Sequence, residues 1–580
     1  MIQREEEILD TADLRIVDML SNMAQAEDDS ALRETLMALS MACEEGSLCL
    51  PSPGLSKYSI IGGPADPTPL ILHRDRLYFH RHFHAEKSIA EGLLRLLNLG
   101  SVPCDPKTVE SVLREILEDK PLRTGDGQPL RLTEKQKQAL DVALGQRVFL
   151  LSGGPGTGKT ALTASLLRGL IRLRKLDPQR IRLCAPTGRA AQRLQESLQQ
   201  SLLSLGDLPA DHPDARLLNL PVETLHRLLG YHPSSGRFAR HPGDPLHADL
   251  VLLDEASMAD AFSLSALVQA LQPNAALILV GDADQLPAVG TGSVLSELLP
   301  MDRKSGLGAA IPTVILDRSH RARQDLLDFA EAINNGDAET VLQRPRLDAP
   351  EGDFANALPG LLDKYADSVF RDKKVQGKNY MEWLQVARKS QDAGSIPAAL
   401  SALMEILGSE RILACLRHGP LGCERVNTLL RRKLEPLFDP SQGKGHFSAF
   451  HGAPLLITRN DTRTGLSNGE IGIWLRDRQG LTAWFQRGGE WLRFPAAFLP
   501  SWESAFATTV HKSQGSECDE VLLILAEEGN RLLTREILYT AVTRARKSVR
   551  IFGSELALRE AVANRLQRWS GLRDYFSTIS

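Results

Sequence analysis

The sequence predicts an α/β fold divided among several domains. Its 580 residues exceed what one hydrophobic core organises, and 42% hydrophobic with 24% charged residues is the composition of an ordinary globular protein. An apolar run at 148–151 precedes a glycine-rich turn and an amphipathic stretch from about Thr160, which indicates strand, turn and helix. Two more apolar runs, 250–253 and 276–280, end in acidic and amide residues. We therefore expect strands whose ends carry polar side chains.

The glycine-rich turn, GGPGTGKT at 153–160, fits the pattern GxxxxGK[ST] at every fixed position. Glycines allow backbone N–H groups to close around phosphate oxygens. In such a loop the lysine, Lys159, reaches the β and γ phosphates, and the Thr160 hydroxyl holds Mg²⁺. The sequence therefore predicts a site for ATP and Mg²⁺ whose loop residues are Gly153, Gly154, Pro155, Gly156, Thr157, Gly158, Lys159 and Thr160.

Polar residues elsewhere complete this predicted site. After the run at 250–253, Asp254 is expected to hold the metal through its shell, and Glu255 to orient or deprotonate the attacking water. Gln285 follows the third strand, where an amide can sense the γ phosphate. Upstream, Gln136 pairs a donor and an acceptor in one plane, which suits an adenine edge. The alternative for Gln136 is an ordinary exposed helical glutamine.

Nine motifs, taken in order, resemble the RecD family, the alpha subunit of exodeoxyribonuclease V, within the superfamily 1 helicases. They extend from about residue 130 to about residue 550, which is most of the chain. The motifs are LTEKQKQA, GGPGTGKT, APTGRAAQRL, TLHRLLG, LLDEASM, GDADQLPAVGTG, LDRSHRA, TTVHKSQGSE and LLTREILYTAVTRAR.

This resemblance implies two RecA-like P-loop motor domains that close on ATP while single-stranded DNA runs across their tops. Arg321 and Arg544 of the second domain are then expected to contact the γ phosphate, where an arginine stabilises transition-state charge. Two surface arginines on helices are the alternative. With these two, the residues expected to carry catalysis are Lys159, Asp254, Glu255, Gln285, Arg321 and Arg544.

The same resemblance supplies a DNA-binding set. Thr187, Gly188 and Arg189 follow a strand, where free N–H groups suit a DNA phosphate, and Thr224 and His226 are expected at a second phosphate. Helix capping is the competing explanation for the two threonines.

The polar run TVHKSQGSE at 509–517 is interpreted as a coupling element. Four residues are expected to face DNA: Thr508, Thr509, His511 and Lys512. Gln514 and Gly515, together with Ser513, are expected nearer the nucleotide.

We expect three domains. They are a mainly helical, partner-binding N-terminal domain at 1–120, a first motor domain at 121–310 and a second at 311–580. A hairpin at about 231–249 is expected to be the pin that splits the duplex, with Phe238 near its tip. Four short strands separated by Asn-Gly, Gln-Gly and Gly-Gly turns predict a small β-barrel at about 451–500, and the resemblance implies that it is SH3-like.

In the N-terminal segment, which by resemblance packs against the gamma subunit, three histidines alternate. His80, His82 and His84 are expected on one strand face, either as a metal site or as a solvated surface. Residues 340–410 match the family weakly, and we expect helices of the second motor domain there.

The net charge of −4 restricts any nucleic-acid site to a local groove, for which 318–323, 430–433 and 543–547 offer basic runs. An acidic start, the lack of a long apolar stretch and cysteines without a CxxC pair favour a cytoplasmic location.

The expected function is that of an ATP-dependent DNA helicase, and the resemblance to the RecD family implies movement 5′ to 3′. Its expected partners are single-stranded and duplex-end DNA and RecB-like and RecC-like subunits, in a helicase and nuclease complex that processes double-strand breaks for recombination. Any nuclease activity would belong to a partner subunit. The alternatives are a free-standing RecD-like helicase and a structural subunit that senses nucleotide.

Overall fold

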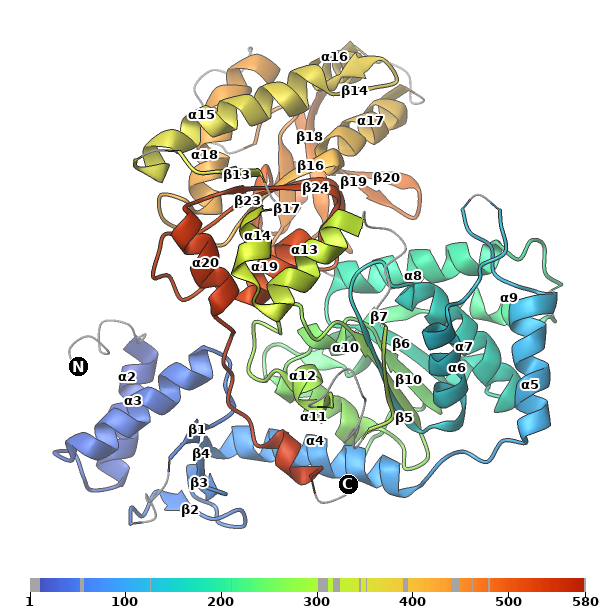
Figure 1. Cartoon of the computed structure of the whole chain (residues 1–580), viewed down its shortest axis with the longest axis vertical. Coiled ribbons are helices and arrows are strands. Elements are labelled where there is room, and N and C mark those ends of the chain that lie inside the picture. The colour runs from blue at the N-terminus through green and yellow to red at the C-terminus, as the bar shows by residue number, and fades with distance from the viewer. Residues whose placement is uncertain are drawn as a thin grey trace. The chain divides into compact units, whose positions relative to one another are not determined.

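The chain divides into two compact units in the computed structural model. The first comprises Met1–Pro186, Ala190–Arg318 and Gln567–Ser580, and the second Thr187–Arg189 and Ser319–Leu566 (Figure 1). The structure describes residues 11–52, 57–125, 127–209, 211–300, 311–316, 324–343, 346–350, 352–389, 395–439, 449–461, 463–477 and 480–577.

The first unit begins with helices and a small mixed sheet. The strand order is β1-β4-β3-β2, in which β2 and β3 are parallel and the other pairs antiparallel. A mainly helical segment was expected, and helices make up most of the described part of it. The small sheet was not predicted, because its strands are too short to show a period-2 pattern. The elements are α2 (Thr11–Met23), α3 (Ser30–Glu44), β1 (Leu50–Pro51), β2 (Ile61–Gly62), β3 (Leu70–His73), β4 (Arg76–Phe79) and α4 (His80–Asn98).

The three alternating histidines lie on helix α4, so their assignment to a strand face is wrong. Apolar residues recur at helical spacing along α4, and the face that they form is buried. This packing outweighs the alternation of the three histidines. His82 is buried on that face, which lowers its pKa to about 4. His80 and His84 are one turn apart, with ring centroids separated by 4.3 Å.

A six-stranded parallel sheet, ordered β12-β5-β11-β10-β6-β7, forms the core of the first unit. Strands β5, β10 and β11 are buried at every residue, because helices cover both faces of such a sheet. The predicted strands are therefore confirmed. The strands are β5 (Val148–Gly153), β6 (Ile181–Ala185), β7 (Val222–Thr224), β10 (Leu250–Leu253), β11 (Ala276–Gly281) and β12 (Thr313–Leu316).

Helices α6, α7 and α8 lie beside this sheet in Figure 1. A two-stranded hairpin, β8 (Tyr231–His232) and β9 (Arg237–Phe238), confirms the hairpin predicted in this region. The helices are α5 (Pro106–Arg114), α6 (Glu134–Gly145), α7 (Lys159–Leu173), α8 (Gly188–Leu203), α9 (Pro213–Leu217), α10 (Leu225–Leu228), α11 (Ala261–Ala270) and α12 (Val294–Leu298).

The second unit holds another parallel sheet, ordered β13-β24-β23-β16-β22. The helices expected between 340 and 410 are present. The strands are β13 (Arg346–Asp348), β16 (Glu410–Ala414), β22 (Ala507–Thr509), β23 (Cys518–Ile524) and β24 (Ala545–Phe552), with a separate hairpin of β14 (Lys374–Val375) and β15 (Lys378–Asn379). The helices are α13 (Gln324–Asn335), α14 (Ala338–Gln343), α15 (Phe354–Asp367), α16 (Tyr380–Lys389), α17 (Ser395–Ser409), α18 (Cys423–Phe438), α19 (Arg535–Val542) and α20 (Glu555–Ala563).

An antiparallel sheet, ordered β20-β19-β18-β17-β21, is inserted in the second unit. The four strands expected at about 451–500 are present, and a fifth, β21, joins them just before β22. The strands are β17 (Pro454–Ile457), β18 (Ile471–Asp477), β19 (Gly480–Arg487), β20 (Glu490–Pro495) and β21 (Trp502–Ser504).

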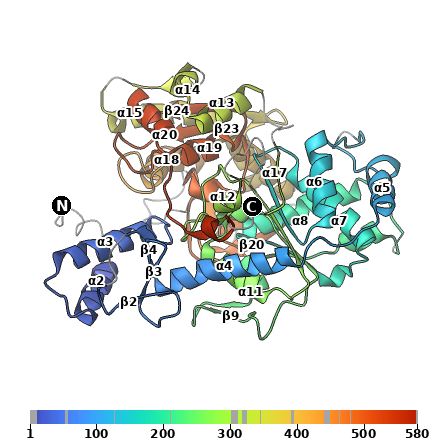
Figure 2. The ribbon, with the colours of Figure 1, turned by 60° about the horizontal axis from the view of Figure 1, so that its bottom comes forward.

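The C-terminal segment packs in the first unit, beside α4 (Figures 1 and 2). Its anchor is Glu86 of α4, whose carboxylate accepts hydrogen bonds from the Gly571 N–H (2.8 Å) and the Ser570 hydroxyl (2.9 Å). Arg76 adds an ion pair to Asp574.

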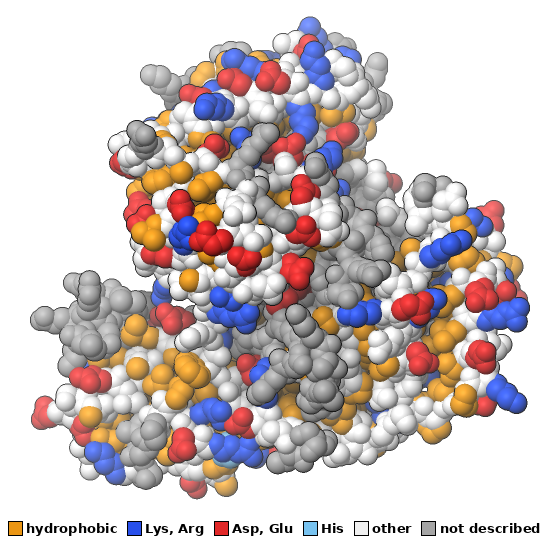
Figure 3. Space-filling view, viewed as in Figure 1, with side chains coloured by type: hydrophobic (Ala, Val, Ile, Leu, Met, Phe, Trp, Pro, Cys, Tyr) orange, Lys and Arg blue, Asp and Glu red, His pale blue; other side chains and the backbone are white. Residues whose placement is uncertain are grey.

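Acidic and basic side chains are interspersed on the face of each unit that Figure 3 shows. Such a mixed surface agrees with the expectation that a nucleic-acid site is local. Within the described ranges, no helix combines the length and apolar character needed to cross a bilayer.

A buried cluster of ion pairs joins helices α7 and α9 of the first unit. Asp214 accepts hydrogen bonds from Arg168 (3.0 Å) and Arg172 (2.6 Å), and the side chains of Asp214 and Arg168 are fully buried. Burial by itself would raise the pKa of Asp214, but the two guanidiniums outweigh it and lower that pKa.

Asp214→Asn should lower the free energy of unfolding of the first unit by about 3 kcal/mol, because it leaves buried guanidiniums without a counter-charge. Urea denaturation monitored by circular dichroism measures this. Asp249→Asn is the matched control, since Asp249 pairs with Arg180 at 2.7 Å on the surface; its midpoint should barely move. Equal midpoints for both variants would contradict the assignment.

Candidate nucleotide and nucleic-acid site

One edge of the first parallel sheet gathers the predicted nucleotide site. Strands β5, β11 and β10 are neighbours and run in the same direction, so the residues after each strand meet at their common carboxyl end. The glycine-rich loop follows β5, Asp282 and Gln285 follow β11, and Asp254 and Glu255 follow β10. The structure therefore brings together the residues that the sequence predicted there.

The loop wraps the start of α7, which begins at Lys159. Gly158 has φ +81°, and a Cβ atom there would lie 2.7 Å from Nε2 of Gln136, so both conformation and space require glycine. The Lys159 ammonium donates hydrogen bonds to the carbonyls of Gly153 (2.5 Å) and Gly154 (3.0 Å). The lysine is thus held at the mouth of the loop, where a phosphate would replace these carbonyls as its partner.

Gln136 is buried, and both ends of its amide bind the chain. Its Oε1 accepts from the Thr133 N–H (2.9 Å), which closes a capping box at the start of α6. Its Nε2 donates to the Thr157 carbonyl (2.8 Å). The exposed-helix alternative is wrong, because this side chain supports the phosphate loop. Contact with an adenine edge stays a prediction.

The acidic pair after β10 is strained and incompletely bonded. Glu255 has φ +51°, a conformation that residues other than glycine rarely adopt. Its Oε2 is buried and accepts no hydrogen bond from the described residues. Loss of hydration raises the pKa of the neighbouring Asp254, the Glu255 charge adds to this, and Lys159 opposes both.

Asp282 and Gln285, which follow β11, are the third group of polar residues at this edge of the sheet. The Gln285 amide donates to Asp282 (2.8 Å), and the remaining Oε1 of Gln285 is buried without a hydrogen-bond partner among the described residues. Burial raises the pKa of Asp282, again against the charge of Lys159. Glu255 and Gln285 thus each carry a buried acceptor atom without a hydrogen-bond partner among the described residues.

In the second unit, the run at 509–517 connects the two ends of the parallel sheet. It leaves the carboxyl end of β22 and returns to the amino end of β23. There the Arg544 guanidinium donates to the Ser516 carbonyl (3.3 Å), and the Cys518 N–H donates to the Arg544 carbonyl (2.9 Å). Gln514 and Ser516, which belong to the second half of the run, are also buried. Arg544 and this half of the run therefore form one packed element.

The other predicted arginine, Arg321, lies outside the described residues, as does the basic run at 318–323.

Residues 136–291 match the AAA domain family and residues 504–552 the UvrD-like helicase C-terminal domain family. The RecBCD enzyme subunit RecD of Mycolicibacterium smegmatis is 33% identical over 99% of this chain and 98% of that protein. The chain belongs to the RecD family. It is also 30% identical to the ATP-dependent RecD2 DNA helicase of Deinococcus radiodurans, over 84% of this chain and 56% of that protein. Among solved structures, the Candida albicans Pif1 helicase matches with a TM-score of 0.41 and 16% identity, over 78% of this chain and 100% of that one.

The predicted DNA-binding residues of this RecD-family chain also lie at strand ends. Thr187 lies between β6 and α8, and Gly188 and Arg189 are the first residues of α8, at a helix N-terminus that suits an anion. Thr224 ends β7, and its hydroxyl caps α10 by accepting from the Arg227 N–H (3.2 Å), so the capping role weighed for it is real. Thr508 is buried in β22.

The hairpin packs its aromatic residues at its base. Phe238 pairs with Tyr231 across the strands, so the expectation of Phe238 near the tip is wrong; the turn consists of residues 233–236. The rings of Tyr231 and Phe238 lie 4.9 and 5.9 Å from that of His226. The hairpin therefore rests on a predicted DNA-binding residue.

Two basic residues at the second sheet were missed from the sequence. Arg417 and His418 follow β16, which neighbours β22, and both are exposed. The apolar run of β16 followed by a polar turn is the same signal that marked the other strand ends.

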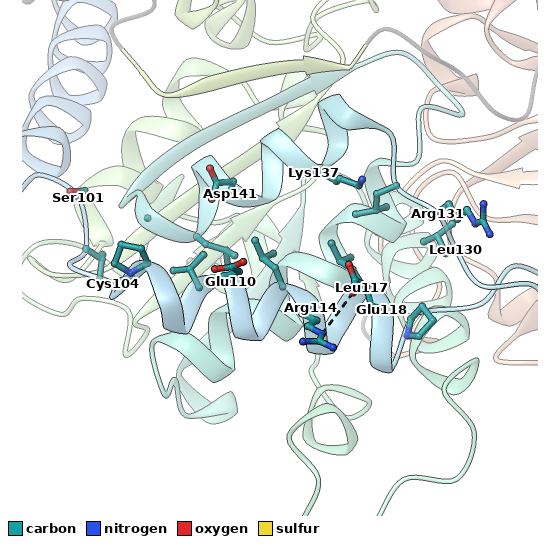
Figure 4. Close-up of a pocket in the computed structure, with 18 of the residues that line it drawn as sticks. Ser101, Cys104, Glu110, Arg114, Leu117, Glu118, Leu130, Arg131, Lys137 and Asp141 are labelled. Carbon is teal, nitrogen blue, oxygen red and sulfur yellow. Dashed lines mark ion pairs between the residues drawn. The ribbon is translucent and has the colours of Figure 1, made fainter.

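A pocket of about 1380 Å³ in the first unit lies apart from the phosphate loop (Figure 4). Glu110, Arg114 and Glu118 rise along one side of it, and Lys137 and Asp141 of α6 along the other. None of the predicted site residues lines it, so cavity size does not mark the nucleotide site of this fold.

Glu255→Gln should lower ATP hydrolysis at least about 100-fold while nucleotide binding is retained, because it removes the carboxylate predicted to be the general base and changes little else. Steady-state hydrolysis and fluorescent-nucleotide titration measure the two effects. Glu196→Gln, on the exposed face of α8, should change neither. Full hydrolysis by Glu255→Gln would exclude Glu255 from the reaction.

Proposed function

We propose that this chain is the motor subunit of a RecBCD-type helicase and nuclease complex, moving 5′ to 3′ on single-stranded DNA. It is an ATP-dependent DNA helicase of the RecD family. The observation that carries the proposal is the relationship to a RecD subunit over 98% of that protein's length, in a chain that retains a complete phosphate-binding edge.

The described residues fit ATP and Mg²⁺. The loop supplies backbone N–H groups, Lys159 is poised at its mouth, and the free acceptors of Glu255 and Gln285 can take hydrogen bonds from water. When bound, Mg²⁺ neutralises phosphate charge; Thr160 would hold it directly and Asp254 through its shell. Glu255 would receive the proton of the attacking water, and Gln285 would orient toward the γ phosphate.

The second unit would supply Arg544 and Arg321 to that reaction, and Gln514 and Gly515 to nucleotide contact. DNA would follow Thr187, Gly188, Arg189, Thr224 and His226, then Thr509, His511 and Lys512. Support for this coupling comes from the run at 509–517, which places His511 and Lys512 at the carboxyl end of the sheet and packs its other half on Arg544. One continuous segment would thereby link the two ligands.

RecB-like and RecC-like subunits are the proposed partners. A free-standing helicase is the alternative, but the Deinococcus radiodurans RecD2 relative is matched over only 56% of its length, so this chain lacks a match to much of it. A subunit that only senses nucleotide is disfavoured by the catalytic geometry of Lys159 and Glu255. Copurification of the untagged partner subunits would distinguish the first two.

The domain limits 1–120, 121–310 and 311–580 remain part of this proposal, although strand β12 and the segment from Gln567 belong to the first compact unit. So does a barrel of SH3 type at about 451–500, supported by the five antiparallel strands there. The hairpin at 231–238 is the proposed pin.

Lys159→Gln should abolish DNA-stimulated ATP hydrolysis, because the substitution removes the cation of the phosphate loop. Hydrolysis is measured with and without oligo-dT. Equal rates for wild type and variant, with or without DNA, would refute a motor. Wild type should unwind a 5′-tailed duplex and not a 3′-tailed one; the opposite preference would reverse the proposed polarity.

Replacing the turn at 233–236 by Asn-Gly should reduce duplex unwinding severalfold while DNA-stimulated hydrolysis is unchanged, because the tip is lost and the aromatic base is kept. A replacement of equal length by glycine and serine is the control. Undiminished unwinding by the shortened hairpin would argue against a pin.

A further inference from the structure

Lys512 lies at the carboxyl edge of the second parallel sheet. It belongs to a short helical turn, His511–Ser513, directly after β22, and its N–H donates to the Thr509 hydroxyl (3.4 Å). Because β22 and β16 are parallel neighbours, Arg417 after β16 approaches the same edge.

A carboxylate already engages this lysine. The Lys512 ammonium donates to Oε1 of Glu503 at 2.6 Å, and the two side chains are 30% and 26% exposed. The other oxygen of Glu503 lies 3.9 Å from the Arg417 guanidinium. Arg417 has a closer partner in Glu424, at 3.0 Å, so the main partner of the Glu503 carboxylate is Lys512, at an edge that solvent reaches.

Glu503 is positioned by a different element from the one that carries Lys512. It sits in β21, where it pairs with Leu456 of β17, and the adjacent Trp502 packs edge-on against the buried Trp474 at 5.2 Å. The inserted antiparallel sheet thus holds the carboxylate, whereas the turn after β22 holds the ammonium.

Carboxylate and phosphate oxygens are equivalent partners for an ammonium, which acts as a compact point charge. A partly exposed ion pair between a lysine and a carboxylate contributes little to stability, so a phosphate can displace the carboxylate. We propose that Glu503 is a positioning residue that competes with the DNA backbone for Lys512, holding the lysine when no phosphate is present and taking it back when a phosphate leaves. This inference rests on the proposed DNA contact of Lys512.

The consequence for a translocating motor is easier release. With Glu503 in place, each phosphate that departs is replaced by a carboxylate, so Lys512 is never left without a partner. Without it, the lysine would hold DNA more tightly and let go more slowly.

The test compares oligo-dT binding by the full-length wild type, Glu503→Gln, Lys512→Met and the double variant across a salt series. Glu503→Gln should tighten binding about fivefold at low salt. It should also steepen the slope of log K against log salt by up to about 0.7, because no freed carboxylate takes up a cation as the phosphate releases one. DNA-stimulated hydrolysis should show a lower KM for DNA together with a lower kcat.

Glu339→Gln is the matched control, since Glu339 pairs with Arg559 at 2.7 Å on helices of the same unit, outside the basic runs; its binding and slope should equal wild type. In the Lys512→Met background, Glu503→Gln should add nothing. If Lys512→Met weakens binding but Glu503→Gln leaves it equal or weaker, the competition is overturned and the DNA contact stands. If Lys512→Met changes neither affinity nor slope, the DNA contact itself fails.

Discussion

The charge balance around Lys159 is the interaction on which the nucleotide edge depends. Parallel strands deliver Asp254, Glu255 and Asp282 to one place, and burial raises the pKa of two of these acids. The Lys159 ammonium lowers both pKa values and so acts against burial. Among the described residues, buried acceptor atoms of Glu255 and Gln285 have no hydrogen-bond partner.

In the second unit, too, a lysine lies at the carboxyl end of the parallel sheet. Lys159 donates to loop carbonyls and Lys512 to a carboxylate, so each lysine that is proposed to bind phosphate has an oxygen of the chain as its partner. Such internal partners hold a long side chain in place and lower the cost of exchange with a ligand. They also differ in origin: the partner of Lys159 lies in the same loop, whereas that of Lys512 comes from an inserted sheet.

Errors in the sequence interpretation arose where local patterns were short. Three alternating histidines indicated a strand, but apolar residues on one face of α4 bury it as a helix. Phe238 was expected at a hairpin tip, yet its ring packs near His226 at the base. An ordinary exposed helical glutamine was the alternative for Gln136, yet its amide is buried and donates to the Thr157 carbonyl. In each case a tertiary contact outweighed a pattern of a few residues.

The sequence by itself determined the parallel strands, the phosphate loop, the acidic and amide strand ends and the family, because continuous apolar runs and fixed glycine spacing have few alternative structures. Only the tertiary structure decided which strands are neighbours, which acceptors stay unsatisfied, how Gln136 is used and that Glu503 meets Lys512. These features depend on the order of the strands and on contacts between side chains of different elements. No sequence pattern links those elements to one another. Pairings of that kind arise from packing, which no local pattern encodes.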